Sequence, residues 1–170
     1  LGNAKRNLLA EMRRIGLDPS YHRPFMAHLG HGLYVIMWNH QYGVDACNAD
    51  DVTRATLEAR AELHRLVDGL RSAGGRWRNL QLIATADQIG TREGRRIYGR
   101  YRITADDLVK GARFDDAVCE ARCNFDLHST DPQKGKDAER VGRAKPYEIP
   151  RRALIAADLD NLFLAGRCLS

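Results

Sequence analysis

The sequence contains no run of apolar residues that approaches the roughly 20 needed to cross a bilayer. It also lacks the features of a secretory signal peptide, because lysine and arginine interrupt the apolar residues of segment 1–16. No internal repeat is visible, and no Ser- or Pro-rich linker separates two domains. We therefore expect a soluble, cytoplasmic protein without a membrane segment.

Cysteine is sparse, and its spacing gives no metal-binding pattern. The four cysteines are Cys47, Cys119, Cys123 and Cys168. A zinc or iron–sulfur site normally has tighter cysteine pairs and more ligands, so free thiols in a reducing compartment are the favoured interpretation. The spacing of His28 and His31 suits chelation, but Gly30 and Gly32 place both in a loop. We predict no metal site from either group.

What the chain does have is a globular composition and an excess of arginine. Of its 170 residues, 44% are hydrophobic and 29% are charged, which suits a domain with a real core. The formal net charge is +5, and the basic excess is arginine rather than lysine. Because arginine makes bidentate contacts with carboxylates and phosphates, nucleic acid, an anionic cofactor and an acidic substrate are all candidate partners.

Hydrophobic periodicity predicts several helices. They span residues 4–15, 50–71, 105–109 and 115–123. Asp50 or Asp51 is expected to cap the second helix, where an acidic residue suits the helix dipole. Thr104 and Asp107 form a capping-box pattern at the start of the third.

Short apolar or alternating runs predict strands between these helices, and the fold class is therefore mixed α/β. The strands are expected over residues 33–38, 80–84, 96–103, 124–128, 147–155 and 162–165. Segment 33–38 is a continuous apolar run and is expected to be buried. Segments 18–32 and 129–145 are expected to be loops.

The first candidate site lies at the C-terminal end. Residues 162–165 are continuously apolar, as in a parallel strand buried on both faces, and Gly166 follows. A small residue there lets the backbone approach a phosphate or a ring. Arg167 and Ser170 would begin the next helix, whose amides favour an anion. An ordinary strand–turn–helix connection explains the same residues equally well.

The second candidate site is an arginine cluster. Its charged members are Arg92, Glu93, Arg95, Arg96 and Arg100. It is either a solvated charged hairpin or a phosphate-binding stripe, with Tyr98 and Tyr101 available to stack on bases. The acidic residues within and after the cluster argue against nucleic acid.

The third candidate site is a carboxylate and an imidazole, Asp126 and His128. In a strand these two side chains point to the same face. A neighbouring carboxylate can fix the tautomer of an imidazole and raise its basicity, which suits a general acid or base. An exposed pair without a catalytic role is the alternative.

Taken in chain order, five segments resemble the C-terminal half of a family of FAD-dependent oxidoreductases named by analogy with the heterodisulfide reductase A subunit. The segments read IGTREGRRIYGRYRITADDL, RFDDAV, FDLHS, YEIPRRALI and NLFLAGRCLS. The resemblance covers roughly residues 38–170. Each motif alone is weak, but five in the family's order and spacing make a strong combined signal.

Several departures from the family pattern bear on what the resemblance implies. The Gly-x-Gly-x-x-Gly fingerprint is absent and would lie upstream of Leu1, so we expect an N-terminal truncation that removes the main FAD-binding domain. Gly94 stands where the family often has Ser or Thr, and Arg151 and Arg152 replace a frequent Tyr-Arg. Some relatives carry iron–sulfur clusters, but the cysteines here do not support one.

The resemblance implies the substrate-side part of a Rossmann-like FAD-binding flavoprotein, incomplete as given. Residues 1–160 would form a substrate or cap-type α+β domain, and residues 161–170 would begin the returning FAD-binding strand. It places Ala165, Gly166, Arg167, Ser170, Arg95 and Arg96 near FAD. It implies catalytic roles for His128 and Arg92, with Glu93 and Asp126 orienting them.

The expected function is hydride or electron transfer through FAD between an unidentified small-molecule substrate and an unknown electron acceptor. The isolated fragment is expected to be inactive. The alternative is a non-enzymatic, arginine-rich module that binds nucleic acid or another polyanion. The two differ in a simple observable, because only the first binds flavin.

Overall fold

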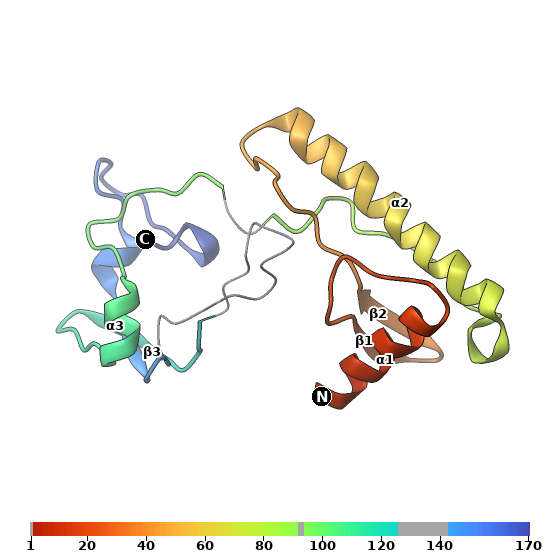
Figure 1. Ribbon diagram of the computed structural model, residues 1–170. Coiled ribbons are helices and arrows are strands. Elements are labelled where there is room, and N and C mark those ends of the chain that lie inside the picture. Colours follow the sequence, from red (N-terminus) through yellow and green to blue (C-terminus); the bar gives the residue numbers. More distant parts are fainter. Residues whose placement is uncertain (1, 92–93, 126–142) are drawn as a thin grey trace. The chain divides into compact units, whose positions relative to one another are not determined.

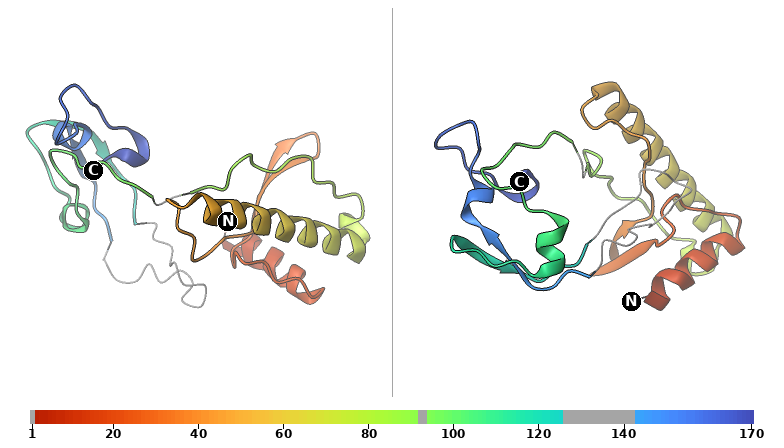
Figure 2. Two further views of the ribbon diagram at one scale, coloured as in Figure 1. Left: turned by 90° about the horizontal axis from the view of Figure 1, so that it is seen from above. Right: turned by 60° about the vertical axis from the view of Figure 1, so that its left-hand side comes forward.

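The computed structural model describes residues 2–91, 94–125 and 143–170 (Figure 1, Figure 2). The chain divides into two compact units, Leu1–Thr91 and Arg92–Ser170. The described residues form three α-helices, short 3₁₀ turns and two antiparallel sheets of two strands each, which confirms the mixed α/β class. Among these residues, no helix is long and apolar enough to span a membrane.

The first unit begins with α1 (Gly2–Arg14) and continues into a hairpin of β1 (Phe25–Gly30) and β2 (Leu33–Met37). The expectation of a loop over residues 18–32 was therefore wrong across β1. His31 and Gly32, which join the strands, both have positive φ, and a two-residue hairpin turn of this kind requires it. His-Gly is a weaker turn signal than Asn-Gly, which is why the sequence did not reveal the hairpin.

The strand predicted over residues 33–38 is confirmed by β2, but its burial was wrong. Leu33, Val35 and Met37 are each about half exposed, whereas Ile36 is packed against the core. A sheet of two strands that rests on its core with one face leaves its other face open. An apolar run therefore did not mean burial on both faces here.

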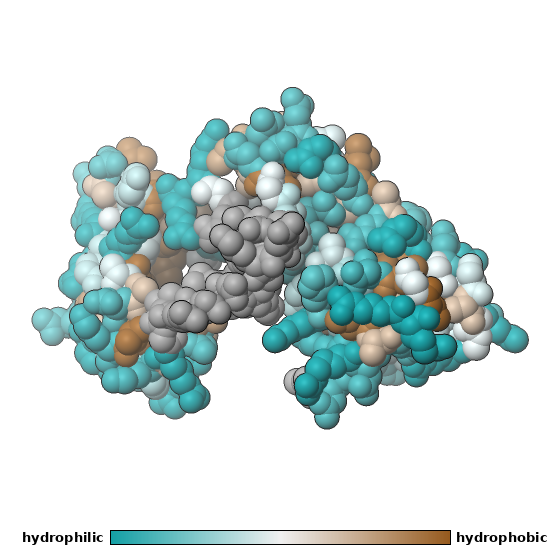
Figure 3. Space-filling view, viewed as in Figure 1, coloured by the Kyte–Doolittle hydropathy of each residue, from teal (hydrophilic) through white to brown (hydrophobic). Residues whose placement is uncertain are grey.

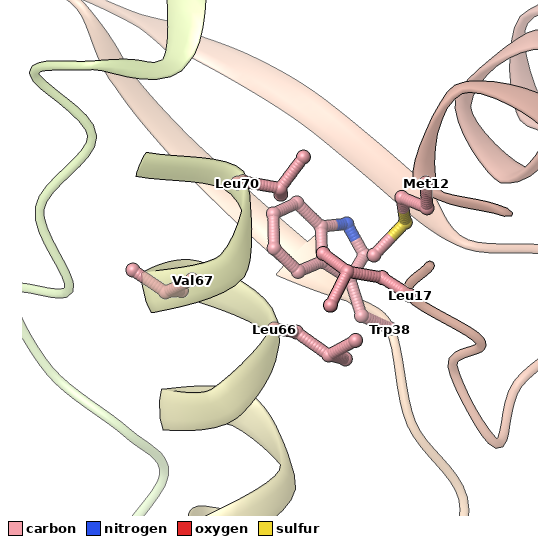
Figure 4. Close-up of a cluster of buried hydrophobic side chains, with 6 residues drawn as sticks. All are labelled: Met12, Leu17, Trp38, Leu66, Val67 and Leu70. Atoms are coloured by element: carbon pink, nitrogen blue, oxygen red, sulfur yellow. The ribbon is translucent and has the colours of Figure 1, made fainter. Parts of the chain in front are cut away.

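The core of the first unit forms where α2 (Ala49–Ala73) meets α1 and the hairpin. Its buried side chains are Met12, Leu17, Trp38, Leu66, Val67 and Leu70 (Figure 4). The N-cap of α2 is Asn48, not Asp50 or Asp51, because the Asn48 side-chain oxygen accepts hydrogen bonds from both aspartate backbone amides. The helix begins before its first periodic apolar residue, so the pattern placed its start too late.

After α2, the 3₁₀ turn η1 (Gly75–Trp77) leads into a segment that was predicted as a strand over residues 80–84. This prediction was wrong, because residues 80–84 form no ladder with another strand. Leu80 and Leu82 are instead packed against the core as irregular chain. The alternating apolar residues thus serve burial without a sheet partner.

The second unit contains α3 (Ala105–Lys110), β3 (Ala117–Ala121) and β4 (Tyr147–Pro150). The capping box of Thr104 and Asp107 is confirmed. The helix predicted over residues 115–123 was wrong, because β3 pairs antiparallel with β4. A helix of that length is marginal by itself, so pairing with a distant segment prevails. Arg113 supports the pairing through ion pairs to Glu120 and Glu148.

The remaining predicted strands are either shorter than expected or replaced by single β-bridges. β4 gives way to the 3₁₀ turn η2 (Arg151–Leu154), so the strand predicted over residues 147–155 is right only at its start. Segments 96–103 and 162–165 each form one isolated antiparallel bridge with segment 155–156. Gly99 pairs with Ala156, and Phe163 pairs with Ile155. The expected buried parallel strand over residues 162–165 was therefore wrong, and Phe163 is 70% exposed.

The C-terminal helix start predicted after Gly166 is a single 3₁₀ turn, η3 (Gly166–Cys168). The predicted strand over residues 124–128 falls mostly outside the described residues. The predicted loop over residues 129–145 does so as well. The proposed domain boundary at residue 160 stays a prediction.

Candidate functional site

The predicted site residues divide into two groups. Those expected to contact the cofactor lie within the described part of the second unit: Ala165, Gly166, Arg167, Ser170, Arg95 and Arg96. The catalytic candidates lie outside the described residues: Arg92, Glu93, Asp126 and His128. Their roles stay predictions, and the geometry of the site is that of the segments around them.

The arginine segment, here residues 94–103, contacts the C-terminal segment, residues 162–170, within this unit. The backbone N–H of Ile103 donates to the carbonyl of Ser170 at 3.2 Å, and the N–H of Ser170 donates to the carbonyl of Ala153 at 3.3 Å. Gly99 makes the contact close, since a Cβ at that position would lie 2.6 Å from the Ser170 Cβ. Two motifs far apart in the sequence are thus joined by one backbone hydrogen bond and by a close contact that a glycine allows.

Arg152 fixes the η2 turn on which this contact rests. Its guanidinium pairs with the Asp116 carboxylate at 3.0 Å and lies over the rings of Tyr101 and Phe114, at 4.9 and 5.4 Å from their centroids. The other Asp116 oxygen accepts the backbone N–H of Arg152 at 3.1 Å. One arginine therefore joins three segments of the unit, by charge, by stacking and through its backbone.

Tyr101 continues this network to α3. Its hydroxyl donates to an Asp107 carboxylate oxygen at 3.0 Å, and the same oxygen accepts the backbone N–H of Thr104 at 2.8 Å. Burial raises the pKa of Tyr101, and the hydrogen bond to Asp107 raises it further. The phenol is therefore neutral at physiological pH and acts as a hydrogen-bond donor that ties α3 to the arginine segment.

A second tyrosine lies beside the segment that leads to Asp126 and His128. The Tyr147 hydroxyl is 3.2 Å from the Cys123 sulfur, and Tyr147 itself is buried. Burial, followed by the contact with Cys123, raises the pKa of Tyr147 to about 12. Sequence reasoning assigned Tyr147 to a family motif but did not predict its thiol partner, because the pair forms only across the β3–β4 sheet.

The backbone at Gly166 is open, and several arginines belong to the same unit. Gly166 has a φ of 59°, and no atom lies within 4 Å of the place where its Cβ would be. Arg95 is exposed and forms no ion pair in the part of the chain that the structure describes. Arg100 is partly neutralised by Asp160 at 3.1 Å. A glycine in this conformation lets a ligand approach the backbone, and arginine side chains are suited to anionic ligands. The contact of these residues with FAD stays a prediction.

The cysteines do not combine into a metal centre. All four are exposed free thiols. Among residues 2–91, 94–125 and 143–170, no group of three or more His, Cys, Asp or Glu side chains is arranged to hold a metal ion.

Comparison with known families decides which family the chain belongs to. The family model described as FAD dependent oxidoreductase matches residues 4–170. The chain belongs to this family. Its cofactor is therefore FAD, its chemistry is oxidation and reduction, and the match extends over both compact units. Neither the comparison with curated proteins nor that with solved structures gives a match.

Within this FAD-dependent oxidoreductase, the residues that sequence reasoning missed are those that support the site. Arg152 and Asp116 had no assigned role, although Arg152 was noted as part of a departure from the family pattern. The signal for such a pair is weak, since an arginine and an aspartate 36 positions apart reveal their contact only in the fold. The nucleic-acid alternative gains no support from the family match.

Proposed function

We propose that this FAD-dependent oxidoreductase is of the heterodisulfide reductase A-like type and that its second unit contributes the substrate side of the flavin site. The observation that supports the proposal is the contact of Gly99 and Ile103 with Ser170, which joins the end of the arginine segment to the C-terminal residue. When bound, FAD supplies the two-electron chemistry. The residues of this chain would bind the cofactor, orient the substrate and transfer protons.

The division of roles follows from the chemistry of each side chain. In this proposal Arg92 stabilises negative charge on the substrate or the reduced cofactor, and Glu93 orients it. His128 takes up or releases a proton, and Asp126 fixes its tautomer. Arg95, Arg96 and Arg167 contribute positive charge near the cofactor. In this proposal the substrate is a small molecule, no electron acceptor is assigned, and a cytoplasmic location stays a prediction.

Flavin content tests whether the protein binds a flavin at all. The full-length protein should purify with the visible absorbance of bound flavin. Replacing Gly99 by Val should lower the flavin-to-protein ratio, because the larger side chain displaces Ser170. A flavin-free protein that binds nucleic acid with steep salt dependence would establish the polyanion-binding alternative instead.

The catalytic roles need a separate measurement. Reduced nicotinamides and thiols can be screened as electron donors by the bleaching of flavin absorbance. With a donor in hand, His128→Ala and Arg92→Ala should keep their flavin and lose about 10²-fold or more in reduction rate. Lys145→Ala, which changes an exposed lysine outside the proposed site, serves as the control. Unchanged reduction rates in the first two variants would reject their catalytic assignment.

A further inference from the structure

A small groove lies in the first unit, away from the residues assigned to the flavin site. It is formed by α1, the start of β1 and η1, which Figure 1 shows as parts of that unit. Its volume is about 260 Å³, and its walls include Lys5, Leu8, Glu11, Phe25, Arg76 and Trp77. Two of these residues are aromatic and three are charged, so the groove combines apolar walls with two cationic side chains and one carboxylate.

The carboxylate in the groove is already neutralised. Glu11 accepts a hydrogen bond from the Trp77 indole at 2.7 Å and is ion-paired with Arg76. Partial burial acts to raise the pKa of Glu11, but the hydrogen bonds from Trp77 and Arg76 outweigh it and hold the pKa below its ordinary value. Glu11 therefore stays ionised with its partners engaged and offers little repulsion to a second anion.

Lys5 leaves the groove with one unbalanced positive charge. Its ammonium lies 5.0 Å from the centroid of the Phe25 ring, and no carboxylate within the described ranges pairs with it. Arg76 lies over the Trp77 ring in the same manner, at 5.1 Å, but its charge is balanced by Glu11. One cation above an aromatic wall matches a ligand with one negative charge and a flat apolar body.

The volume limits the size of that ligand. Drug-sized ligands occupy pockets of about 300–1,000 Å³, so a groove of about 260 Å³ holds one or two rings and not a dinucleotide. We propose that this groove binds a small aromatic monoanion, an aromatic carboxylate or sulfonate, with Lys5 facing the acid group and Phe25 and Trp77 contacting the ring. This site is separate from the proposed flavin site and does not depend on it.

The test uses 5-dimethylaminonaphthalene-1-sulfonate, a fluorescent aromatic monoanion with two rings, with benzoate and uncharged benzamide as competitors. The full chain should show saturable fluorescence enhancement, and benzoate should displace the dye at least about tenfold more effectively than benzamide. Lys5→Met should weaken dye binding at least about fivefold at low salt, because it removes the unbalanced charge. Lys145→Met makes the same charge change on the other unit and should leave binding unchanged.

The exposed apolar face of the hairpin offers a competing dye site and therefore needs its own variant. Val35→Lys places a charge on that face, and the groove proposal requires dye binding to survive it. Dye binding that is lost in Val35→Lys and retained in Lys5→Met would overturn the proposal. So would equal displacement by benzoate and benzamide, or the absence of saturable binding. Added salt tests the charge of Lys5 without altering α1. It should weaken dye binding to the unsubstituted chain as Lys5→Met does, and salt-independent binding would also overturn the proposal.

Discussion

Replacing Gly99 by Ala tests the contact that joins the two motifs of the proposed flavin site. The added Cβ would lie 2.6 Å from the Ser170 Cβ and 3.1 Å from the carbonyl oxygens of Ala153 and Tyr101. Ordinary contacts begin near 3.4 Å, so the C-terminal segment must move by several tenths of an ångström. Overpacking of this kind costs about 1–3 kcal/mol.

The loss should be local, because the displaced atoms belong to Ser170, whose carbonyl accepts a hydrogen bond from the Ile103 N–H. We expect hydrogen-exchange protection of the Ile103 and Ser170 amides to fall by roughly one to two orders of magnitude. The matched control is Gly90→Ala, since no atom lies within 4 Å of the Cβ position at Gly90. Equal protection in the two variants would refute the close contact and the reasoning built on it.

Three further predictions concern interactions that support the two units. Arg152→Met should lower the free energy of urea unfolding by about 2 kcal/mol, because it removes a partly exposed ion pair and two ring contacts, whereas Arg152→Lys should recover only part of the loss. Asn48→Ala should destabilise α2 by about 1 kcal/mol in urea melts followed by circular dichroism, and a larger loss in Asp50→Ala would contradict the cap assignment. Burial acts to raise the pKa of Asp107, but hydrogen bonds from Thr104 and Tyr101 outweigh it and hold that pKa below its ordinary value. The stability that Asp107 contributes is therefore complete above its unfolded-state pKa and is lost as pH falls through its folded-state pKa. Asp107→Asn should flatten that acid limb of an unfolding-versus-pH curve, and an unchanged limb would exclude Asp107 as its source.

Sequence reasoning succeeded where the determinants are local. The helical periodicity over residues 4–15 and 50–71 predicted α1 and α2, because a helix satisfies its backbone within a few residues. The capping box of Thr104 and Asp107 was predicted for the same reason, since its two hydrogen bonds join residues three positions apart. The order of the family motifs is also a property of the chain alone, and the family match agrees with it.

The strands were the main failure, and the reason is that their partners lie elsewhere. β3 was predicted as helix because nothing within residues 115–123 announces its pairing with β4. β1 was missed because its partner depends on a hairpin turn made by His31 and Gly32. A strand's hydrogen bonds go to another segment, so its own sequence states only half of the interaction.

The candidate site divides in the same way between sequence and tertiary structure. The sequence by itself determined the family, and it predicted site residues, including Gly166 and the arginines of segment 92–100, whose roles stay predictions. Only the tertiary structure decided that Gly99 lies against Ser170, that Arg152 is held by Asp116 and two rings, and that Tyr147 meets Cys123. These contacts join residues far apart in the chain, and their free energy depends on distances that no local pattern encodes.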